Sequence, residues 1–428
     1  MAYPTDQNNF LGATPVHWQN QSIAYSDTMN MDAFGRLRVS NPNILLENQH
    51  QYNTSPLLWD QALVGGGTVT FLPNESSVQL NVGTASGDKV TRQTHEYFRY
   101  QPGRSQFIMV TALFGPSKTN VRSRIGYHDD NNGMYFERIS TGVSVNIRSF
   151  TSGAVVNTSV PQASWNVDPL NGTGPSGINI NWDLKQLFFI DFQWLGTGRV
   201  RFGIIDNGLY YICHEFEFGN LLTVPYTTTA NLPCRVTIEN LGTTATASSM
   251  KQTCISVMSE GGVAEESGIP YSTSNGIVKK AITGRMPVLA IRLAPTFNGV
   301  VNRAHLQLLT ATIITDANVF VELAYGSAGI DPTTLTAPVW TSVATNSIAQ
   351  FDISATAVSG GEIVTSGYVN VTGAGTNAVG AAAIDIKNER IVTNSMDGTT
   401  PDIVTIVCTP FSGTANVSAS ISWLEQYL

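Results

Sequence analysis

The residues best suited to chemistry are two glutamates, Glu215 and Glu217, in the segment His214-Glu-Phe-Glu-Phe218. If this segment is a strand, both carboxylates project from one face, about 6.5–7 Å apart. That spacing lies between the carboxylate separations used in retaining and in inverting glycoside hydrolysis. The pair is therefore the strongest candidate in the sequence for an acid and a base or nucleophile.

A structural role explains the same segment better. The segment resembles the Glu-x-Asp-x-x-Glu strand of jelly-roll glucanases. In this chain, however, the middle acid is Glu217 instead of aspartate, and Asn220 replaces the last acid. With a period of two, one face of the strand is apolar and would turn to a core, leaving both glutamates in solvent. That face would consist of Ile212, His214, Phe216 and Phe218. We therefore expect a hydrogen-bonded core histidine, no catalytic residues and no enzymatic activity.

No residue spacing predicts a metal or cofactor site. No two of the six histidines lie two or four positions apart, as zinc ligands often do. Asp129-Asp-Asn-Asn-Gly133 lacks the alternating ligands and distal glutamate of a calcium loop, and indicates a hairpin turn. Gly65-Gly-Gly67 is not followed by the Lys-Ser/Thr pair of a phosphate-binding loop.

Aromatic side chains offer a second kind of site. The chain has 7 Trp and 14 Tyr, which could stack on sugars or fill sandwich cores and subunit contacts. We favour the second role and keep glycan contact as the alternative. The candidates for glycan contact are Trp165, Trp182, Tyr210 and Tyr211.

The composition excludes several classes of protein. Charged residues make up 13% of the chain, against about 25% in an ordinary soluble domain. The formal net charge is −8 and no Lys/Arg run is present, so we expect no nucleic-acid partner. No apolar run approaches the roughly 18–20 residues of a membrane helix, and the N-terminus does not resemble a signal peptide. The four cysteines match no zinc spacing, and we expect most to be buried as small hydrophobes.

The elements that position these residues are expected to be β-strands, in which apolar and polar side chains alternate. From Gly65 to about Met258, short runs such as residues 200–204 alternate apolar and polar side chains between turn clusters such as Asp206-Asn-Gly208. This pattern is typical of an antiparallel β-sandwich. The nearly continuous apolar run Leu187–Leu195 predicts a central strand that is buried on both faces.

A second β region follows a break in the pattern. Residues 260–276 are acidic or rich in Gly and Ser, which indicates a linker. The flat, uncharged stretch 371–383 predicts packing against another subunit. The expected units are an extended arm (1–55), a first sandwich (56–260), a linker (261–276) and a C-terminal β-sandwich (277–428).

The arm contains one patterned segment, Asp32-Ala-Phe-Gly-Arg-Leu-Arg-Val-Ser40, which we interpret as a short strand or hook. Polar arms of this kind often order only against a neighbour. With Asn41-Pro and Leu45-Leu46, the segment resembles a stretch near the N-terminus of many tailed-bacteriophage virion proteins. Three further segments resemble the central domain of the same group of proteins: residues 181–203, Cys213-His-Glu-Phe and Asn231-Leu-Pro-Cys-Arg235.

This resemblance covers roughly residues 30–260 and implies a concanavalin-like lectin jelly roll and a structural role in the virion. Our leading hypothesis is a non-enzymatic tail, baseplate or surface-appendage protein, docked on the virion by its arm. In this hypothesis Phe34, Leu37 and Val39 insert into a neighbour, and Arg36 and Arg38 pair with its acids. The partners are other virion proteins and further copies of this chain, with a trimer as one candidate.

Three alternatives stay open on the same sequence. A capsid decoration (cement) protein would use both sandwiches against its neighbours. A receptor-recognition protein would bind a host surface glycan through exposed aromatic residues, and a depolymerase would depend on Glu215 and Glu217. The first two, like the leading hypothesis, place the protein in the virion after assembly in the host cytoplasm.

Overall fold

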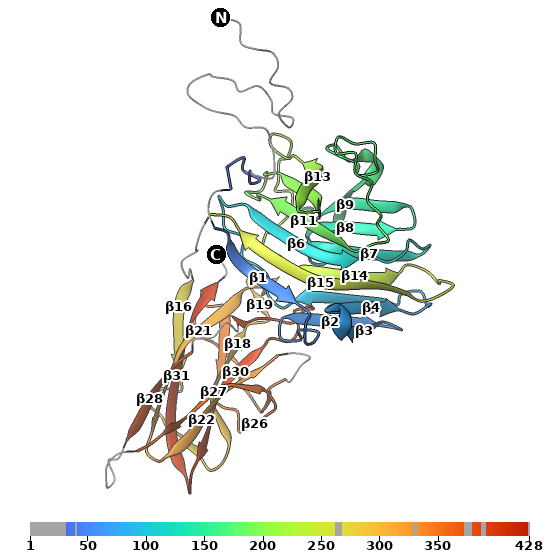
Figure 1. The fold of residues 1–428 in the computed structure, drawn as a ribbon. Coiled ribbons are helices and arrows are strands. Elements are labelled where there is room, and N and C mark those ends of the chain that lie inside the picture. The colour runs from blue at the N-terminus through green and yellow to red at the C-terminus, as the bar shows by residue number, and fades with distance from the viewer. Residues whose placement is uncertain are drawn as a thin grey trace, which may run out of the picture.

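The computed structural model describes residues 31–38, 41–261, 268–327, 332–371, 379–386 and 391–426. Within this part the chain consists of antiparallel β-sheets and two single 3-10 turns, Pro73–Glu75 and Gln162–Ser164, and has no α-helix. The predicted all-β class is confirmed. Two sandwiches follow one another along the chain (Figure 1).

The first sandwich, the jelly roll, consists of two facing sheets. One sheet, here called the clamp sheet, has the order β13-β12-β11-β6-β15-β4-β3, with β1 pairing along β15. Its strands are β1 (Asn43–Gln49), β3 (Thr68–Leu72), β4 (Ser77–Val82), β6 (Gln106–Leu113), β11 (Gln186–Phe192), β12 (Val200–Asp206), β13 (Leu209–Phe216) and β15 (Ser248–Ser259).

The facing sheet has the order β10-β9-β8-β7-β14-β5-β2. Its strands are β2 (Trp59–Val64), β5 (Lys89–Thr94), β7 (Val121–His128), β8 (Gly133–Ile139), β9 (Gly142–Ser149), β10 (Val156–Pro161) and β14 (Cys234–Asn240). Apolar residues from both sheets form a single core between them. The alternation in the sequence is the cause, because every second side chain of a strand points to the same face.

Strand β11 shows how this pattern works at the centre of the clamp sheet. It pairs with β12 on one side and β6 on the other, as predicted for the apolar run. Phe188 and Ile190 point into the core. Phe189 and Asp191 point to the opposite face, and both are fully buried there. The outer face of this sheet is therefore covered.

The predicted boundary of the jelly roll at residue 56 is too late. Strand β1 lies inside the predicted arm and pairs with β15 from Asn43↔Ser259 to Gln49↔Cys254. Its sequence, Asn-Ile-Leu-Leu-Glu-Asn-Gln, does not alternate, so it resembles the polar arm before it. Strand β1 is stabilised by backbone hydrogen bonds to the long strand β15, and the sequence of β1 alone gives no sign of this partner.

The C-terminal sandwich has two sheets around its own core. The first sheet contains β16 (Ile269–Ser274), β17 (Lys280–Ile282), β21 (His305–Thr315), β28 (Gly380–Asp385), β29 (Ile391–Val392) and β31 (Ala415–Gln426). The second contains β18 (Met286–Leu293), β22 (Val319–Gly326), β24 (Thr341–Ser342), β25 (Ala349–Asp352), β27 (Glu362–Val369) and β30 (Ile403–Pro410). Two short ribbons pair β19 (Thr296–Phe297) with β20 (Val300–Val301), and β23 (Thr334–Thr336) with β26 (Ala357–Ser359).

The C-terminal sandwich also differs from the predicted boundaries. Strand β16 lies in the predicted linker but pairs with β31 along its whole length, so the C-terminal sandwich begins earlier than residue 277. Residues 262–267 of the linker and 372–378 of the flat stretch lie outside the described residues. Strand β28, from the same stretch, forms an edge of its sheet with Ala381 and Ala383 exposed. Self-association through this stretch stays a prediction.

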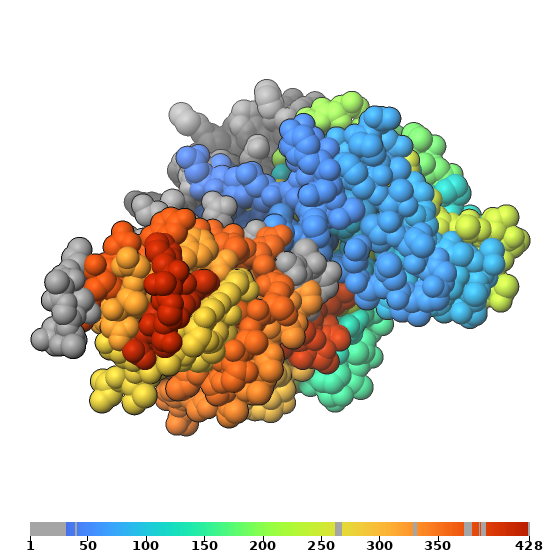
Figure 2. All heavy atoms as spheres, turned by 90° about the horizontal axis from the view of Figure 1, so that it is seen from below, coloured from blue at the N-terminus to red at the C-terminus, as the bar shows by residue number. Residues whose placement is uncertain are grey.

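Polar contacts join the two sandwiches. Asp60 of β2 accepts a hydrogen bond from the backbone N–H of Met396 at 2.9 Å. The Arg303 guanidinium lies 4.9 Å from the centre of the Tyr97 ring. Figure 2 shows the yellow-to-red C-terminal sandwich directly against the blue-to-green jelly roll.

The expectation that most cysteines are buried is confirmed: Cys213, Cys234 and Cys408 are buried and Cys254 is partly buried, all as free thiols.

Candidate functional site

The patterned segment of the arm forms a tight hook over residues 31–38. Asp32 organises it, because its Oδ1 accepts hydrogen bonds from the N–H groups of Phe34 and Arg36, both at 2.9 Å. Gly35 has a φ of +75°, a conformation that favours glycine. An antiparallel bridge between Met31 and Leu37 closes the loop. The expectation of a short strand or hook is therefore confirmed as a hook (dark blue in Figure 1).

Arg38 attaches the end of the hook to the clamp sheet. Its guanidinium pairs with Asp191 of β11 at 2.5 Å and with Glu260, which directly follows β15. It also lies 4.7 Å from the centre of the Phe107 ring of β6. Asp191 pairs with Arg201 of β12, its direct neighbour across the two strands. These four charged groups, two cationic and two anionic, are here called the clamp.

Backbone groups of the hook add further attachments. The N–H of Ala33 donates to Ser105 Oγ at 3.2 Å, and its carbonyl accepts from Arg199 Nε at 3.0 Å. Arg201 Nη2 donates to the carbonyl of Met31 at 2.7 Å. The hook is therefore bound at its start, middle and end to the outer face of the clamp sheet.

The clamp is a largely buried ionic network. The side chains of Asp191 and Arg201 are fully buried, and that of Arg38 is 17% exposed. Burial raises the pKa of Glu260, and the adjacent Arg38 guanidinium partly offsets this effect. Both carboxylates are engaged by arginine, so the cluster is suited to holding the hook in one conformation and not to proton transfer.

The clamp changes the predicted roles of the docking residues. Arg36 and Arg38 were expected to pair with acids of a neighbour, but Arg36 pairs with Asp32 at 2.7 Å and Arg38 is committed to the clamp. Arg38 therefore anchors the hook within the molecule. If its guanidinium moved to a neighbouring protein, the buried carboxylates of Asp191 and Glu260 would lose their pairing with it, which costs free energy. Leu37 is 48% exposed and Phe34 is half-buried. Val39 lies outside the described residues.

Sequence reasoning missed Asp191 as the partner of Arg38. A signal was present, because Asp191 is the one charged residue in the apolar run Leu187–Leu195. A buried charge of this kind requires a partner of opposite charge. Arg201 on the following strand supplies one partner, and Arg38 supplies the other.

The predicted glycan contacts do not form one surface. Trp165 is buried, and its indole N–H donates to the carbonyl of Val160 at 3.1 Å. Trp182 packs edge-on against it, with the ring centres 6.0 Å apart. The Trp165 ring belongs to the jelly-roll core and Trp182 packs against that core, partly buried, so a sugar cannot stack on the Trp165 ring as it lies. Tyr211 also packs on the core, and Tyr210, 43% exposed, is on the other face.

Tyr210 and Tyr211 point to opposite faces because they are consecutive strand residues. A β-bulge later in strand β13 corrects the expected alternation of that strand. The register shifts between Phe202 and Gly203 of β12, so Cys213, instead of Ile212, points into the core. His214 is buried, and its Nδ1 accepts a hydrogen bond from the N–H of Asn166 at 3.2 Å. Burial lowers the pKa of His214 to about 4, as expected for a neutral core histidine.

The two glutamates of the catalytic alternative have different surroundings. Glu215 lies 3.7 Å from an Arg199 guanidinium nitrogen. Glu217 comes after the end of β13 and is exposed. The pair therefore does not project from one regular strand into a shared cavity, and the expected absence of catalysis stays a prediction.

An exposed aromatic cluster on the C-terminal sandwich was not predicted. The ring of Tyr368 lies 5.2 Å from Phe320 and 5.8 Å from Phe411, measured between centres. Tyr368 is 67% and Phe411 57% exposed. This tip cluster lies near the turn after β21, whereas His305 at the other end of β21 lies beside the jelly roll. The signal was Phe320, which occupies the solvent face of an alternating strand.

The remaining candidate loops have structural roles. Asp129 Oδ1 accepts hydrogen bonds from the N–H groups of Asn131 and Asn132, and Gly133 has a φ of +138°, as expected for a hairpin turn. Within the described ranges, no three His, Cys, Asp or Glu side chains gather as a metal would require. No helix in that same part of the chain is long and apolar enough to cross a membrane.

Comparisons with known proteins give a likeness in fold only. No protein-family model and no curated protein matches the sequence. About half of the chain, 51%, is similar to a legume lectin-like domain from Entamoeba histolytica, covering 97% of that domain at 12% identity with a TM-score of 0.30.

Two further solved structures match the chain. One is Rv0315 of Mycobacterium tuberculosis, described as an immunostimulatory antigen and pseudo beta-1,3-glucanase (10% identity, 51% of this chain, all of that chain, TM-score 0.36). The other is the carbohydrate recognition domain of Emp47p (8% identity, 50% of this chain, 95% of that chain, TM-score 0.33). At these scores the likenesses carry no argument about function.

Proposed function

We propose that the chain is a non-enzymatic structural subunit of a tailed-phage virion that is held on the particle through its hook and the arm before it. The observation that carries this proposal is the clamp. Four buried or partly buried charged groups fix the hook so that Leu37 and the Arg36 side chain, 51% exposed, face outward. A loop that is already rigid loses little conformational entropy when a partner binds it.

The arrangement of the molecule supports the same proposal. The hook lies on the clamp sheet of the jelly roll, and the tip cluster belongs to β22, β27 and the turn after β30 in the C-terminal sandwich. Attachment through the hook would leave the C-terminal sandwich pointing away from the particle. The subunit would be assembled in the host cytoplasm, with other virion proteins and further copies of itself as partners.

The hook is tested by Leu37→Asp. We expect at least a tenfold loss of incorporation into particles, because a charge replaces an apolar contact at the centre of the proposed interface. The thermal midpoint should change little, since Leu37 is half-exposed. Leu241→Asp is the matched control, because Leu241 is 52% exposed in the loop before β15, remote from the hook. Equal incorporation of the two variants would contradict the proposal.

Glycan recognition by the tip cluster is the second candidate function. The observation in its favour is that three aromatic rings are grouped on the C-terminal sandwich and that two of them, Tyr368 and Phe411, are exposed. Aromatic faces of this kind offer apolar contact area with little loss of side-chain entropy. In this alternative the same particle subunit would also contact a polysaccharide of the host surface.

The double variant Tyr368→Ala/Phe411→Ala tests this alternative on an array of host surface polysaccharides. We expect at least a tenfold weaker signal than for the intact chain, because most of the exposed ring surface is removed. Val339→Ala serves as a control, since Val339 is 66% exposed elsewhere on the same sandwich. No signal for the intact chain, or an unchanged signal for the double variant, would exclude the tip cluster as a glycan site.

A further inference from the structure

A cavity of about 500 Å³ lies where the jelly roll meets the C-terminal sandwich. Its walls come from both units, with Leu57 and Phe98 on the jelly-roll side and Ile391 on the other. The size is within the range of small-molecule sites in proteins, which are also mostly apolar with a few polar groups. Neither the hook nor the tip cluster contributes to it.

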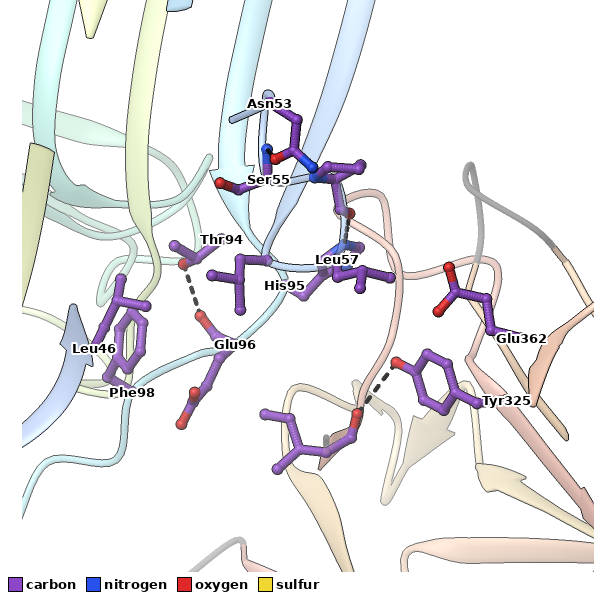
Figure 3. Close-up of a pocket in the computed structure, with 13 residues that line it drawn as sticks. Leu46, Asn53, Ser55, Leu57, Thr94, His95, Glu96, Phe98, Tyr325 and Glu362 are labelled. Atoms are coloured by element: carbon purple, nitrogen blue, oxygen red, sulfur yellow. Dashed lines mark hydrogen bonds between the residues drawn. The ribbon is translucent and has the colours of Figure 1, made fainter. Parts of the chain in front are cut away.

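Two carboxylates enter this cavity from opposite walls. Glu96 follows β5 of the jelly roll, and Glu362 is the first residue of β27. Figure 3 shows their side chains on the two sides of the cavity, with the Tyr325 hydroxyl near Glu362. Among the residues that the structure describes, the cavity lining includes no lysine or arginine. The lining therefore combines apolar surface with negative charge.

Glu96 is the most unusual of these groups. Its backbone carbonyl accepts a hydrogen bond from Thr94 Oγ1 at 2.9 Å, but its carboxylate has no hydrogen bond or ion pair to any described residue. Burial raises the pKa of Glu96 to about 8. The ionised form of such a group is costly unless a cation compensates it.

We propose that the cavity binds a compact organic cation, an ammonium group carried on an apolar body, with the Glu96 carboxylate as its counter-ion. The ammonium group supplies the positive charge that no described lysine or arginine of the lining provides to Glu96. The apolar body would contact the Leu57, Phe98 and Ile391 side chains. Such a ligand would contact both sandwiches and hold them in one relative position.

Binding should depend on pH in a defined direction. The cation pairs with the ionised carboxylate, so affinity rises with pH up to about 8 and then levels off. An alkylammonium ion stays charged over this range, as a lysine side chain does. We expect about a tenfold gain in affinity between pH 7 and pH 9. The other titratable groups around Glu96 are His95, Glu362 and Tyr325 in the lining, and Tyr127 and Cys234 behind it.

The test is calorimetric titration of the full chain with three probes of one length: hexylammonium, hexanol and hexanoate. We expect hexylammonium to bind one site at least tenfold more tightly than hexanol, and hexanoate not to bind. Glu96→Gln should weaken hexylammonium binding at least tenfold and remove its pH dependence. The control is Glu47→Gln, because Glu47 is exposed beside Leu46, a lining residue, and lies outside the cavity.

Two outcomes would overturn this proposal. Equal binding of hexanol and hexylammonium would mean an apolar cavity without charge recognition. Absence of hexylammonium binding to the intact chain would mean that the cavity is not a cation site. Both comparisons use the unchanged protein, so they hold even if Glu96→Gln fails to fold. Neither outcome affects the proposed role of the hook, which is assayed on particles.

Discussion

Replacing Arg38 with alanine is expected to lower the free energy of unfolding of the jelly roll by about 3 kcal/mol. The change leaves Asp191 and Glu260 with a single buried cation, Arg201, and it also removes the contact with the Phe107 ring. Breaking a buried ion pair costs about 3–5 kcal/mol. We expect the low end because Arg38 is 17% exposed and Arg201 still pairs with Asp191.

Arg36→Ala is the matched control for stability. Arg36 belongs to the same hook and also forms an ion pair, but its side chain is 51% exposed. Surface pairs of this kind contribute about 0–1 kcal/mol. Urea denaturation followed by tryptophan fluorescence measures both variants. Equal losses of stability in Arg38→Ala and Arg36→Ala would show that the clamp does not hold the hook.

Replacing Trp423 with alanine is expected to destabilise the C-terminal sandwich by about 3–5 kcal/mol. Trp423 is fully buried in the core of that sandwich, and its indole N–H donates to Glu425 Oε1 at 3.2 Å. The substitution would leave a large cavity that the rigid sheets cannot fill by collapsing. Trp423→Phe, which keeps a ring at the site, should cost clearly less.

These two variants also test the division into two cores. The jelly-roll core and the C-terminal core consist of different residues. In calorimetry, Arg38→Ala should lower the unfolding temperature of one transition and Trp423→Ala that of the other. If each variant lowered both transitions by the same amount, the two sandwiches would unfold as one unit and the contacts at Asp60 and Arg303 would be stronger than we infer.

The sequence predicts the regular strands well, because apolar and polar residues alternate wherever one face of a strand is buried and the other is not. Residues 200–204 alternate and form β12, and the apolar run at residue 187 forms β11. Strands β1 and β16 were missed because partners far along the chain, β15 and β31, stabilise them. Strand β1 shows no alternation in its sequence, and β16 alternates over only six residues, so neither pattern reveals its partner.

The candidate site was predicted only in part. The hook was found from its alternating apolar and cationic residues, but its acidic partners lie 153 and 222 positions away from Arg38. Local spacing cannot reveal pairs of this kind. The bulge at Cys213 also left no signal in the sequence. The expected alternation is right for His214 and Phe216 but wrong for Ile212, because one additional residue changes the face of the side chains before it relative to those after it.

The most direct test of the proposed function is a cryo-EM reconstruction of the intact virion with this chain located in the density. We predict that Leu37 and the Arg36 side chain contact a neighbouring virion protein, that Arg38 stays in the clamp, and that the tip cluster points away from the particle. A reconstruction in which both sandwiches pack flat on the capsid, with the hook facing solvent, would contradict the account. The chain would then be a cement protein.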